Sequence, residues 1–353
     1  MRTNIRPDQL EAHVAGANPV RLQSLRGMQL SGGNLAGGIF EQVDLSSCDL
    51  SGADLRECLF VSCRLDGARL DNANLTQAVF QASSLQGVSF RDAKLQDANL
   101  VESTLNQPDF SSADLKDTGF VNSSIHDGRF SNANIDFTVF SECNLIRPDF
   151  SGTRLHRPVF IKADLRGAKF EGCSLYLATF VECCLAEMKL SQIDFTLTQF
   201  IRADLAGADL SDCILHQANF QGASLRSANL ERIKASNAIF LQAHAEDARF
   251  AGAEIPQAIF CEANVERAVF TGGNAYQSQW QNARCAGCRF DGMELTYADF
   301  SNADLSMTDF SESSMFRVRL HRVLDEGAHI PNRYLALGED KERLEAELWR
   351  PQV

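Results

Sequence analysis

The chain has 353 residues, with 33 Lys and Arg residues against 46 Asp and Glu residues, which gives a formal net charge of −13. This charge argues against direct binding of nucleic acid through a basic groove. No run of eighteen apolar residues is present, so no membrane span is expected, and the chain is long enough to bury a substantial core.

Residues 1–19 precede the repeat that organises most of the chain. Pro7, Leu10, Val14 and Gly16 predict a short helix that starts at a proline and stops at a glycine. The segment lacks the apolar core of a signal peptide, so export by that route is not expected. We expect this N-terminal cap to cover the first coil, whose bare strand edges would otherwise pair with other chains.

Residues 20–320 follow a period of five, and an apolar residue occupies every multiple of five in this range. About sixty pentads therefore share one register. In an α-helix, residues five apart are rotated by roughly 140° about the axis, and in a strand they alternate between the two faces. Neither element alone can therefore bury every fifth residue. The remaining solution is a short extended piece followed by a corner. The fifth residue, which we call the centre, then points inward, as does the residue two before it. Glycine two residues after the centre, as at Gly52 and Gly67, suits such a corner, and four corners close a square.

The motifs Gly-Ala-Asp-Leu at 52–55, Asp-Ala-Asn-Leu at 97–100 and Asn-Ala-Asp-Leu at 302–305 resemble the pentapeptide-repeat family. The resemblance covers residues 20–320. Membership implies an all-β fold, a right-handed quadrilateral β-helix with twenty residues per coil. Residues 20–320 would then make about fifteen coils, with short helical caps at both ends.

Residues twenty apart test this coil length independently, because they should stack on one face. Phenylalanine occupies most multiples of twenty, and Trp280 falls in the same column. A second column of phenylalanines, from Phe90 to Phe310, lies ten residues away. Small residues flank the tryptophan, as close packing requires. Three prolines at inward positions remove backbone donors and predict altered pairing in their coils: Pro108, Pro148 and Pro158.

Residues 321–353 form a predicted C-terminal cap, because the period fails after Leu320. Residues 338–350 have the pattern of a helix with acidic residues at its start. Two interpretations of this helix stay open. It covers the last coil, or it associates with a second copy of the chain through an apolar side made of Leu337, Leu344, Leu348 and Trp349.

Catalytic and metal-binding patterns are not found. Most of the eleven cysteines take the place of alanine in the predicted core, and their odd number fits a reducing cytoplasm. Cys285 and Cys288 form a C-x-x-C motif without a second pair at zinc spacing. The histidines are scattered, and outward aspartates such as Asp204 and Asp209 follow from the repeat and are expected to be solvated. We therefore predict no enzyme, no cofactor, no metal and no small-molecule substrate.

The residues that flank the centres should point outward and be polar, but one column departs from this rule. Apolar residues line the outside of the multiple-of-twenty column: Leu59, Val61, Val79, Val101, Val121, Val139, Val159, Ile161, Val181, Ile201, Ile239, Leu241 and Ile259. Such a stripe is typical of an interaction surface. It is also typical of the most regular of four sheets, because β-branched residues favour extended strands. Both interpretations stay open.

A secondary patch of large apolar residues is predicted on the neighbouring face: Phe137, Tyr176, Leu177, Leu197, Tyr276, Tyr297 and Phe316. Exposed aromatic residues favour contacts with partners. Corner residues can also fold back over their own coil, which would hide them.

We expect a non-enzymatic, bacterial, cytoplasmic protein that acts as a rigid scaffold for protein–protein interaction or self-association through the apolar stripe. The family resemblance implies two alternatives. One is a duplex-DNA mimic that binds DNA gyrase or topoisomerase IV and protects or inhibits it. The other is a bacterial effector or secretion-associated protein, secreted without a classical signal peptide. The sequence does not name the partner.

Charge opposes the DNA-mimic alternative. Fifteen coils would make a rod on the order of 72 Å long, and a duplex of that length carries roughly forty charges. Arginines are interspersed with the acidic residues throughout the repeat, so no side of the predicted coil is a continuous acidic ladder.

Overall fold

The computed structural model describes residues 5–153, 155–173 and 175–349, in two compact units, Met1–Cys184 (unit 1) and Leu185–Val353 (unit 2). Unit 1 begins with helix α1 (Pro7–Ala15), which has its proline at the first helical turn and Gly16 after its last residue, as the sequence predicts. Leu10 and Val14 are buried, and the carboxylate of Glu11 accepts a hydrogen bond from the Asn34 N–H. The helix therefore packs against the first coil.

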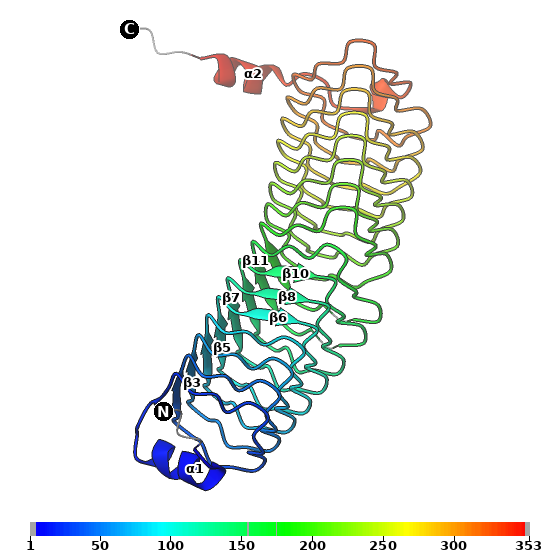
Figure 1. The fold of residues 1–353 in the computed structure, drawn as a ribbon. Coiled ribbons are helices and arrows are strands. Elements are labelled where there is room, and N and C mark those ends of the chain that lie inside the picture. The colour runs from blue at the N-terminus through cyan, green and yellow to red at the C-terminus, as the bar shows by residue number, and fades with distance from the viewer. Residues whose placement is uncertain (1–4, 154, 174, 350–353) are drawn as a thin grey trace. The chain divides into compact units, whose positions relative to one another are not determined.

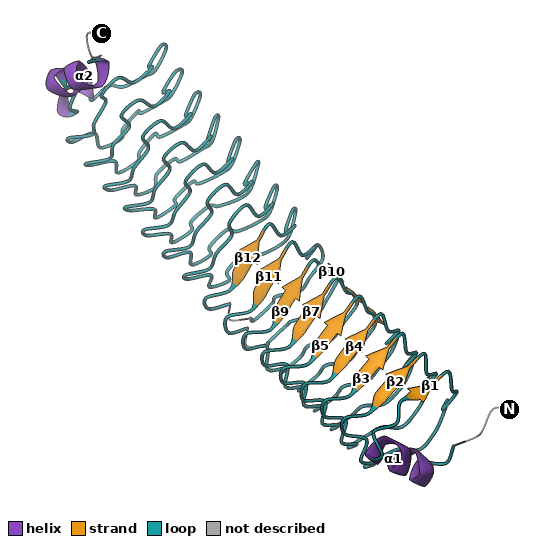
Figure 2. Cartoon of the chain, turned by 90° about the vertical axis from the view of Figure 1, so that its left-hand side faces the viewer, coloured by secondary structure: helices purple, strands orange, loops and turns teal. Residues whose placement is uncertain are grey.

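Unit 1 contains two parallel sheets. The strands of the larger sheet lie side by side in Figure 2, and those of the smaller sheet lie side by side in Figure 1. The order in the nine-stranded sheet is β1-β2-β3-β4-β5-β7-β9-β11-β12, and the order in the three-stranded sheet is β10-β8-β6. The strands of the larger sheet are β1 (Val20–Arg21), β2 (Ile39–Glu41), β3 (Leu59–Val61), β4 (Val79–Gln81), β5 (Asn99–Val101), β7 (Gly119–Val121), β9 (Val139–Ser141), β11 (Val159–Ile161) and β12 (Thr179–Val181). Those of the smaller sheet are β6 (Thr104–Asn106), β8 (Ser124–His126) and β10 (Asn144–Ile146).

Every strand pair joins residues twenty apart, such as Phe140 with Phe160. The remaining sides of each coil are joined by isolated parallel bridges with the same spacing, for example Asp49 with Arg69. One turn of the chain therefore takes twenty residues and contacts the next turn on four sides. The predicted coil length is confirmed, and unit 1 is a parallel β-solenoid.

The corners are tight turns in which the second residue after the centre has a positive φ. Gly52 has a φ of 67°, and the Ala53 N–H donates to the Leu50 carbonyl at 3.0 Å. This combination is the geometry of a type II turn. Many corners hold a residue other than glycine in the same conformation, such as Arg232 with a φ of 56°. The repeat thus imposes the left-handed conformation even where glycine is absent.

The core contains the two predicted columns of aromatic rings. In unit 1, Phe140 stacks on Phe120 and Phe160 with ring centroids 4.8 and 5.0 Å away. Phe130 and Phe150, from the other column, each meet Phe140 edge-on at 6.2 Å. Within a column the rings are nearly parallel, and between columns they are nearly perpendicular. Both arrangements are favourable for aromatic quadrupoles.

Proline accounts for two of the three strands of the smaller sheet, β6 and β10, but not for β8, which precedes a corner with Gly128. At ordinary corners the third residue after the centre donates its N–H back to the centre, but Pro108 and Pro148 stand at that position and have no N–H. The corners before them lack this turn hydrogen bond, and the chain extends there into β6 and β10, with β8 between them. The predicted change in pairing is confirmed at these two coils.

Unit 2 repeats the twenty-residue period through single bridges, from Lys189 with Asp209 to Asp309 with His329. The bridge of Arg319 with Leu337 departs from this period, and the described residues of unit 2 form no strand longer than a single bridge. Phe260 stacks on Trp280 at 4.1 Å, and the Trp280 Nε1–H donates to Ser278 Oγ. Coil pairing continues past Leu320, where the predicted solenoid ends, because Leu324 and His329 still bridge to the preceding coil.

Unit 2 ends with a 3-10 helix, η1 (Arg333–Leu335), and helix α2 (Lys341–Leu348). The Asp340 side chain accepts a hydrogen bond from the Arg343 N–H, so α2 begins after this cap and not at Gly338, where the sequence predicts it. No helix of the described residues is long and apolar enough to span a membrane. The handedness and the total of about fifteen coils stay predictions.

Candidate functional site

The predicted apolar stripe has members in both units. Its part in unit 1, which we call the unit 1 apolar face, consists of outward residues of the nine-stranded sheet: Leu59, Val61, Val79, Val101, Val121, Val139, Val159, Ile161 and Val181. Each is half-buried, whereas the centre beside it is fully buried. These side chains therefore lie on the outer surface, as expected from the pentad phase.

Strand register concentrates the apolar residues at one part of this face. Val159 pairs with Val139 on one side, and Ile161 pairs with Val181 on the other. Because side chains directly opposite each other on neighbouring strands are close, Val139, Val159, Ile161 and Val181 form one contiguous cluster, the β9–β12 cluster. Toward the N-terminus, Asn99, Gly119 and Gln81 interrupt the apolar rows.

Sheet regularity also explains the residue types in this face. All nine residues lie in named three-residue strands, and β-branched side chains fit the pleated, half-buried surface of such strands. The structure is thus compatible with both interpretations of the stripe, an interface and a regular sheet.

The unit 2 part of the stripe is different. Ile201, Ile239, Leu241 and Ile259 are half-buried, but they lie at turns or single bridges, and only Ile239 and Ile259 pair with each other. Strand propensity therefore does not account for their type. Ile239 and Ile259 are therefore adjacent, Leu241 follows Ile239 on the same coil, and Ile201 is separated from Leu241 by Gln221.

The secondary patch separates into two groups. In unit 1, Phe137 and Tyr176 are 39% and 44% exposed, and the His156 ring lies between them. His156 Nδ1 is 2.8 Å from the Asp136 carboxylate, and the Arg157 guanidinium lies over the Phe137 ring. Leu177 is half-buried beside this group. The aromatic side chains stand out from the corners and do not fold back over the coil.

The second group lies in unit 2, where Tyr297 meets both Tyr276 and Phe316 edge-on at 5.9 Å. All three rings are exposed. Leu197, also predicted for this patch, is half-buried in unit 2. Exposed aromatic residues of the predicted patch therefore form one group within unit 1 and another within unit 2.

Helix α2 is held by polar contacts and not by its apolar side. Glu347 contacts His321 Nε2 at 3.3 Å and Arg322 at 3.1 Å, and the Asp340 N–H donates to His321 Nδ1. Hydrogen bonds from Arg322, Arg343 and His321 lower the pKa of Glu347 to about 2. Of the predicted apolar side, Leu344 is half-buried and the others are exposed: Leu337, Leu348 and Trp349. The helix does not bury this side against the last coil.

Outward aspartates and asparagines have a structural role that sequence reasoning missed. The Asp209 carboxylate accepts the N–H of Ser211 at 3.1 Å, and Asp204 accepts the N–H of Ala206 in the same way. Such Asx turns satisfy a backbone donor at these corners. The spacing of the Asp or Asn one residue before the centre is the signal from which these turns could have been predicted.

Neither thiol nor metal chemistry is assembled in the described part of the chain. Eight cysteines are buried, including both members of the C-x-x-C motif. Burial raises the pKa of Cys58, Cys183 and Cys213 to about 12, which disfavours the reactive thiolate. Among the described residues, no three His, Cys, Asp or Glu side chains are grouped as metal ligands.

Two family models cover most of the chain. The pentapeptide repeat region matches residues 34–110 and 107–180, and pentapeptide repeats in eight copies match residues 193–232, 228–272 and 281–322. No curated protein matches.

Several solved structures are similar to the chain. QnrB1, a plasmid-mediated fluoroquinolone resistance protein, is 22% identical over 49% of this chain and 91% of its own, with a TM-score of 0.30. HetL, involved in regulating heterocyst differentiation in the cyanobacterium Nostoc sp. strain PCC 7120, is 22% identical over 84% of this chain and 97% of its own, with a TM-score of 0.25. A thylakoid-lumen pentapeptide repeat protein of Arabidopsis thaliana is 27% identical over 34% of this chain and 70% of its own, with a TM-score of 0.18. From the five-residue register, the four-sided pairing and the two family models, we conclude that this chain belongs to the pentapeptide-repeat family.

Proposed function

We propose that the protein is a non-catalytic scaffold that binds a protein partner, or a second copy of itself, through the unit 1 apolar face. The observation that supports this proposal is the β9–β12 cluster, where Val139, Val159, Ile161 and Val181 are neighbours in parallel register on the outside of the sheet. A contiguous apolar surface of this kind is typical of interaction sites.

Rigidity is the proposed mechanism of this scaffold. The backbone groups beside each centre are hydrogen-bonded to the adjacent coils, so the spacing of the outward side chains is fixed before docking. Valine and isoleucine have few rotamers, so little side-chain entropy is lost when a partner covers them. The free energy of apolar burial then contributes to binding with a small ordering cost.

A paired substitution tests the proposal. Val159→Asp with Ile161→Lys places two charges in the β9–β12 cluster without changing the net charge. The matched control is Lys169→Asp with Glu171→Lys, which also keeps the net charge and alters exposed residues on a different side of unit 1. For the first variant, sedimentation velocity should change if the face binds a second copy, and partner capture should change if it binds another protein. Neither measurement should change for the second variant.

If the first variant keeps the assembly state and the captured partner of the parent protein, the unit 1 apolar face is not the interface. Thermal unfolding of both variants serves as the folding control. Loss of binding in the control variant as well would indicate a general charge effect and would equally contradict the proposal.

The structure does not favour the DNA-mimic alternative. Corner arginines neutralise carboxylates of the coil before them in two-pronged ion pairs, Arg147 with Asp127 and Arg232 with Asp212. A duplex mimic needs unpaired negative charge along its length. Gyrase supercoiling with and without a quinolone is the assay for that alternative. No observation on the described residues favours a secreted effector, and the many free thiols support a reducing cytoplasm as the proposed location.

A further inference from the structure

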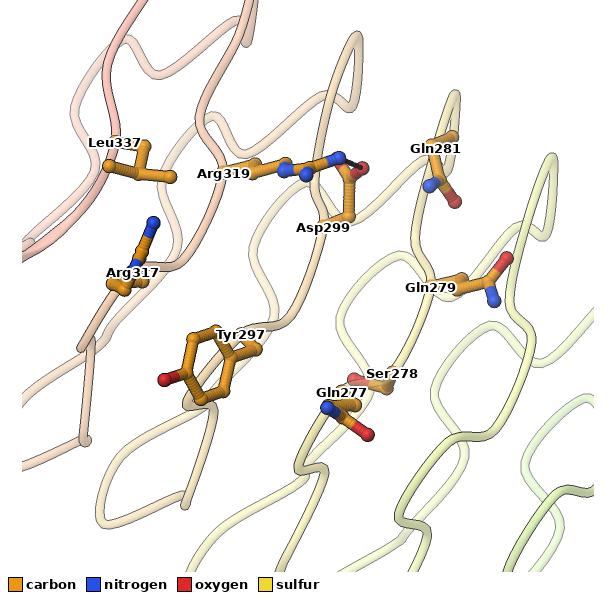
Figure 3. A pocket seen from close by; sticks show the side chains of 9 residues that line it. All are labelled: Gln277, Ser278, Gln279, Gln281, Tyr297, Asp299, Arg317, Arg319 and Leu337. Carbon is orange, nitrogen blue, oxygen red and sulfur yellow. Dashed lines mark hydrogen bonds and ion pairs between the residues drawn. The ribbon is translucent and has the colours of Figure 1, made fainter.

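Unit 2 contains a polar groove that shares only Tyr297 and Leu337 with the surfaces described above. Its volume is about 560 Å³, and its lining includes Gln277, Gln279, Tyr297, Asp299, Arg317 and Arg319 (Figure 3). The volume lies within the range of ligand sites, roughly 300 to 1,000 Å³. The groove lies wholly within the last coils of unit 2.

Two rows of side chains form the groove, one along a corner and one along the adjoining side of the coil. The corner row is Gln277, Tyr297 and Arg317, all with positive φ and therefore turned outward in the same way. The second row is Gln279, Asp299 and Arg319, joined coil to coil by parallel bridges. Leu337 bridges to Arg319 and closes the C-terminal end of the groove.

Arg317 differs from the ion-paired corner arginines in what lies on the coil before it, and it resembles Arg157, which lies over the Phe137 ring. Arg267 stands at an equivalent corner above Asp247, and its guanidinium binds that carboxylate with two hydrogen bonds of 2.7 Å. Below Arg317 the corresponding residue is Tyr297, and the guanidinium lies 5.9 Å from the centre of its ring. The Arg317 side chain makes no ion pair and no side-chain hydrogen bond to another described residue. Its fork of N–H donors is therefore free to bind a ligand.

Arg319 adds a second positive charge to the groove. It is 3.4 Å from the Asp299 carboxylate, and that carboxylate also accepts the N–H and the hydroxyl of Ser301. The Arg319 side chain is 61% exposed. Burial raises the pKa of Asp299, but hydrogen bonds, chiefly from Ser301, outweigh it and hold the pKa below its ordinary value. With Asp299 ionised, the two arginines leave the groove with one positive charge in a chain of net charge −13.

We propose that this groove binds an acidic peptide segment of a partner protein, with a carboxylate of the peptide held by Arg317 and Arg319. The planar guanidinium forms two parallel hydrogen bonds to a carboxylate, and the Tyr297 ring keeps the Arg317 fork in place by stacking. The glutamine amides supply donors and acceptors for the peptide backbone. The open shape of the groove suits an extended segment better than an enclosed small molecule.

Fluorescence anisotropy of labelled peptides tests this proposal on the full chain. The probe is a fluorescein-labelled Glu-Gly repeat peptide, and a Gln-Gly repeat peptide with the same label is its control. We expect the Glu-Gly peptide to bind more tightly and to lose affinity as salt rises. Arg317→Gly should weaken binding about tenfold or more, which corresponds to about 1.4 kcal/mol, because a charge-assisted hydrogen bond is lost.

Glycine is a safe replacement at this corner, because Gly287 and Gly292 hold equivalent corners with positive φ. Arg267→Gly is the matched control, since it removes an arginine that is already paired. Arg319→Gln should also weaken binding, because it removes the second guanidinium that holds the carboxylate. This substitution leaves the corner residues unchanged.

Three results would overturn the proposal. The first is equal binding of the two peptides, or none. The second is a loss of affinity in Arg267→Gly as large as that in Arg317→Gly. The third is displacement of the probe by inorganic phosphate at lower concentration than by glutarate, which would assign the groove to phosphate and not to carboxylate.

Discussion

Replacing Phe140 by alanine tests the core of unit 1 quantitatively. Phe140 is fully buried, stacks on two rings at 4.8 and 5.0 Å, and meets two more edge-on at 6.2 Å. Removal of a buried phenylalanine side chain costs about 3–5 kcal/mol, and aromatic pairs add about 0.5–1.5 kcal/mol each. We therefore expect a local cost in the middle of the range for a buried phenylalanine, about 4 kcal/mol. Phe140→Leu should cost about half as much, because β5 already has Leu100 in this column against Phe120.

Hydrogen exchange measured by mass spectrometry is the appropriate assay, because long repeat arrays do not unfold as two states. A cost of about 4 kcal/mol predicts roughly a thousandfold faster exchange of the amides of β7, β9 and β11, if they exchange through local opening. Coils contact only their neighbours, so peptides near α1 should change little. Less than a tenfold change in β9, or an equal change throughout unit 1, would refute this description of the core.

Two further predictions concern single hydrogen-bonding groups. Ser103→Ala should destabilise unit 1 by about 1–3 kcal/mol, measured by hydrogen exchange, because the buried Ser103 hydroxyl accepts the otherwise unpaired Ser83 N–H at 3.2 Å. Ser103→Thr is the milder control, and equal protection of Ser83 in the parent and the alanine variant would contradict the assignment. The attachment of α2 should be fully present above pH 4.5, the ordinary pKa of a glutamate, and should be lost as the pH falls toward 2, because the pKa of Glu347 is lowered to about 2. The rate of proteolysis of α2 across this pH range reports the loss of attachment. Glu347→Gln should produce the same loss at neutral pH. A cleavage rate that does not depend on pH in the parent protein would contradict the prediction.

The regular part of the fold could be predicted because the repeat determines it. The phase of five places each centre inside, and the column of Phe140, Phe160 and Phe180 stacks with ring centroids 5.0 and 5.1 Å apart. The recurrence of large phenylalanine side chains every twenty residues was sufficient to predict these columns. The altered pairing at Pro108 and Pro148 was also predictable, because proline cannot supply the turn donor.

Features that depend on relations between coils were not predictable in the same way. The sequence does not distinguish the three-residue strands of unit 1 from the single bridges of unit 2, because both have the same pentads. The groove at Arg317 depends on two facts that are distant in sequence, the tyrosine twenty residues before it and the return of Leu337 beside Arg319. The orientation of α2 depends on ion pairs at Glu347, which no periodic pattern indicates.

The central claim, that the unit 1 apolar face is an interface, can be tested by photo-crosslinking. A benzophenone amino acid would replace Val159 in one protein and Lys169, on another side of the same unit, in a second. We predict an adduct at position 159 and none at position 169. The adduct joins a second copy when the purified protein is irradiated alone, or a partner when a cell extract is present. Equal crosslinking at both positions, or none at 159, would contradict the claim.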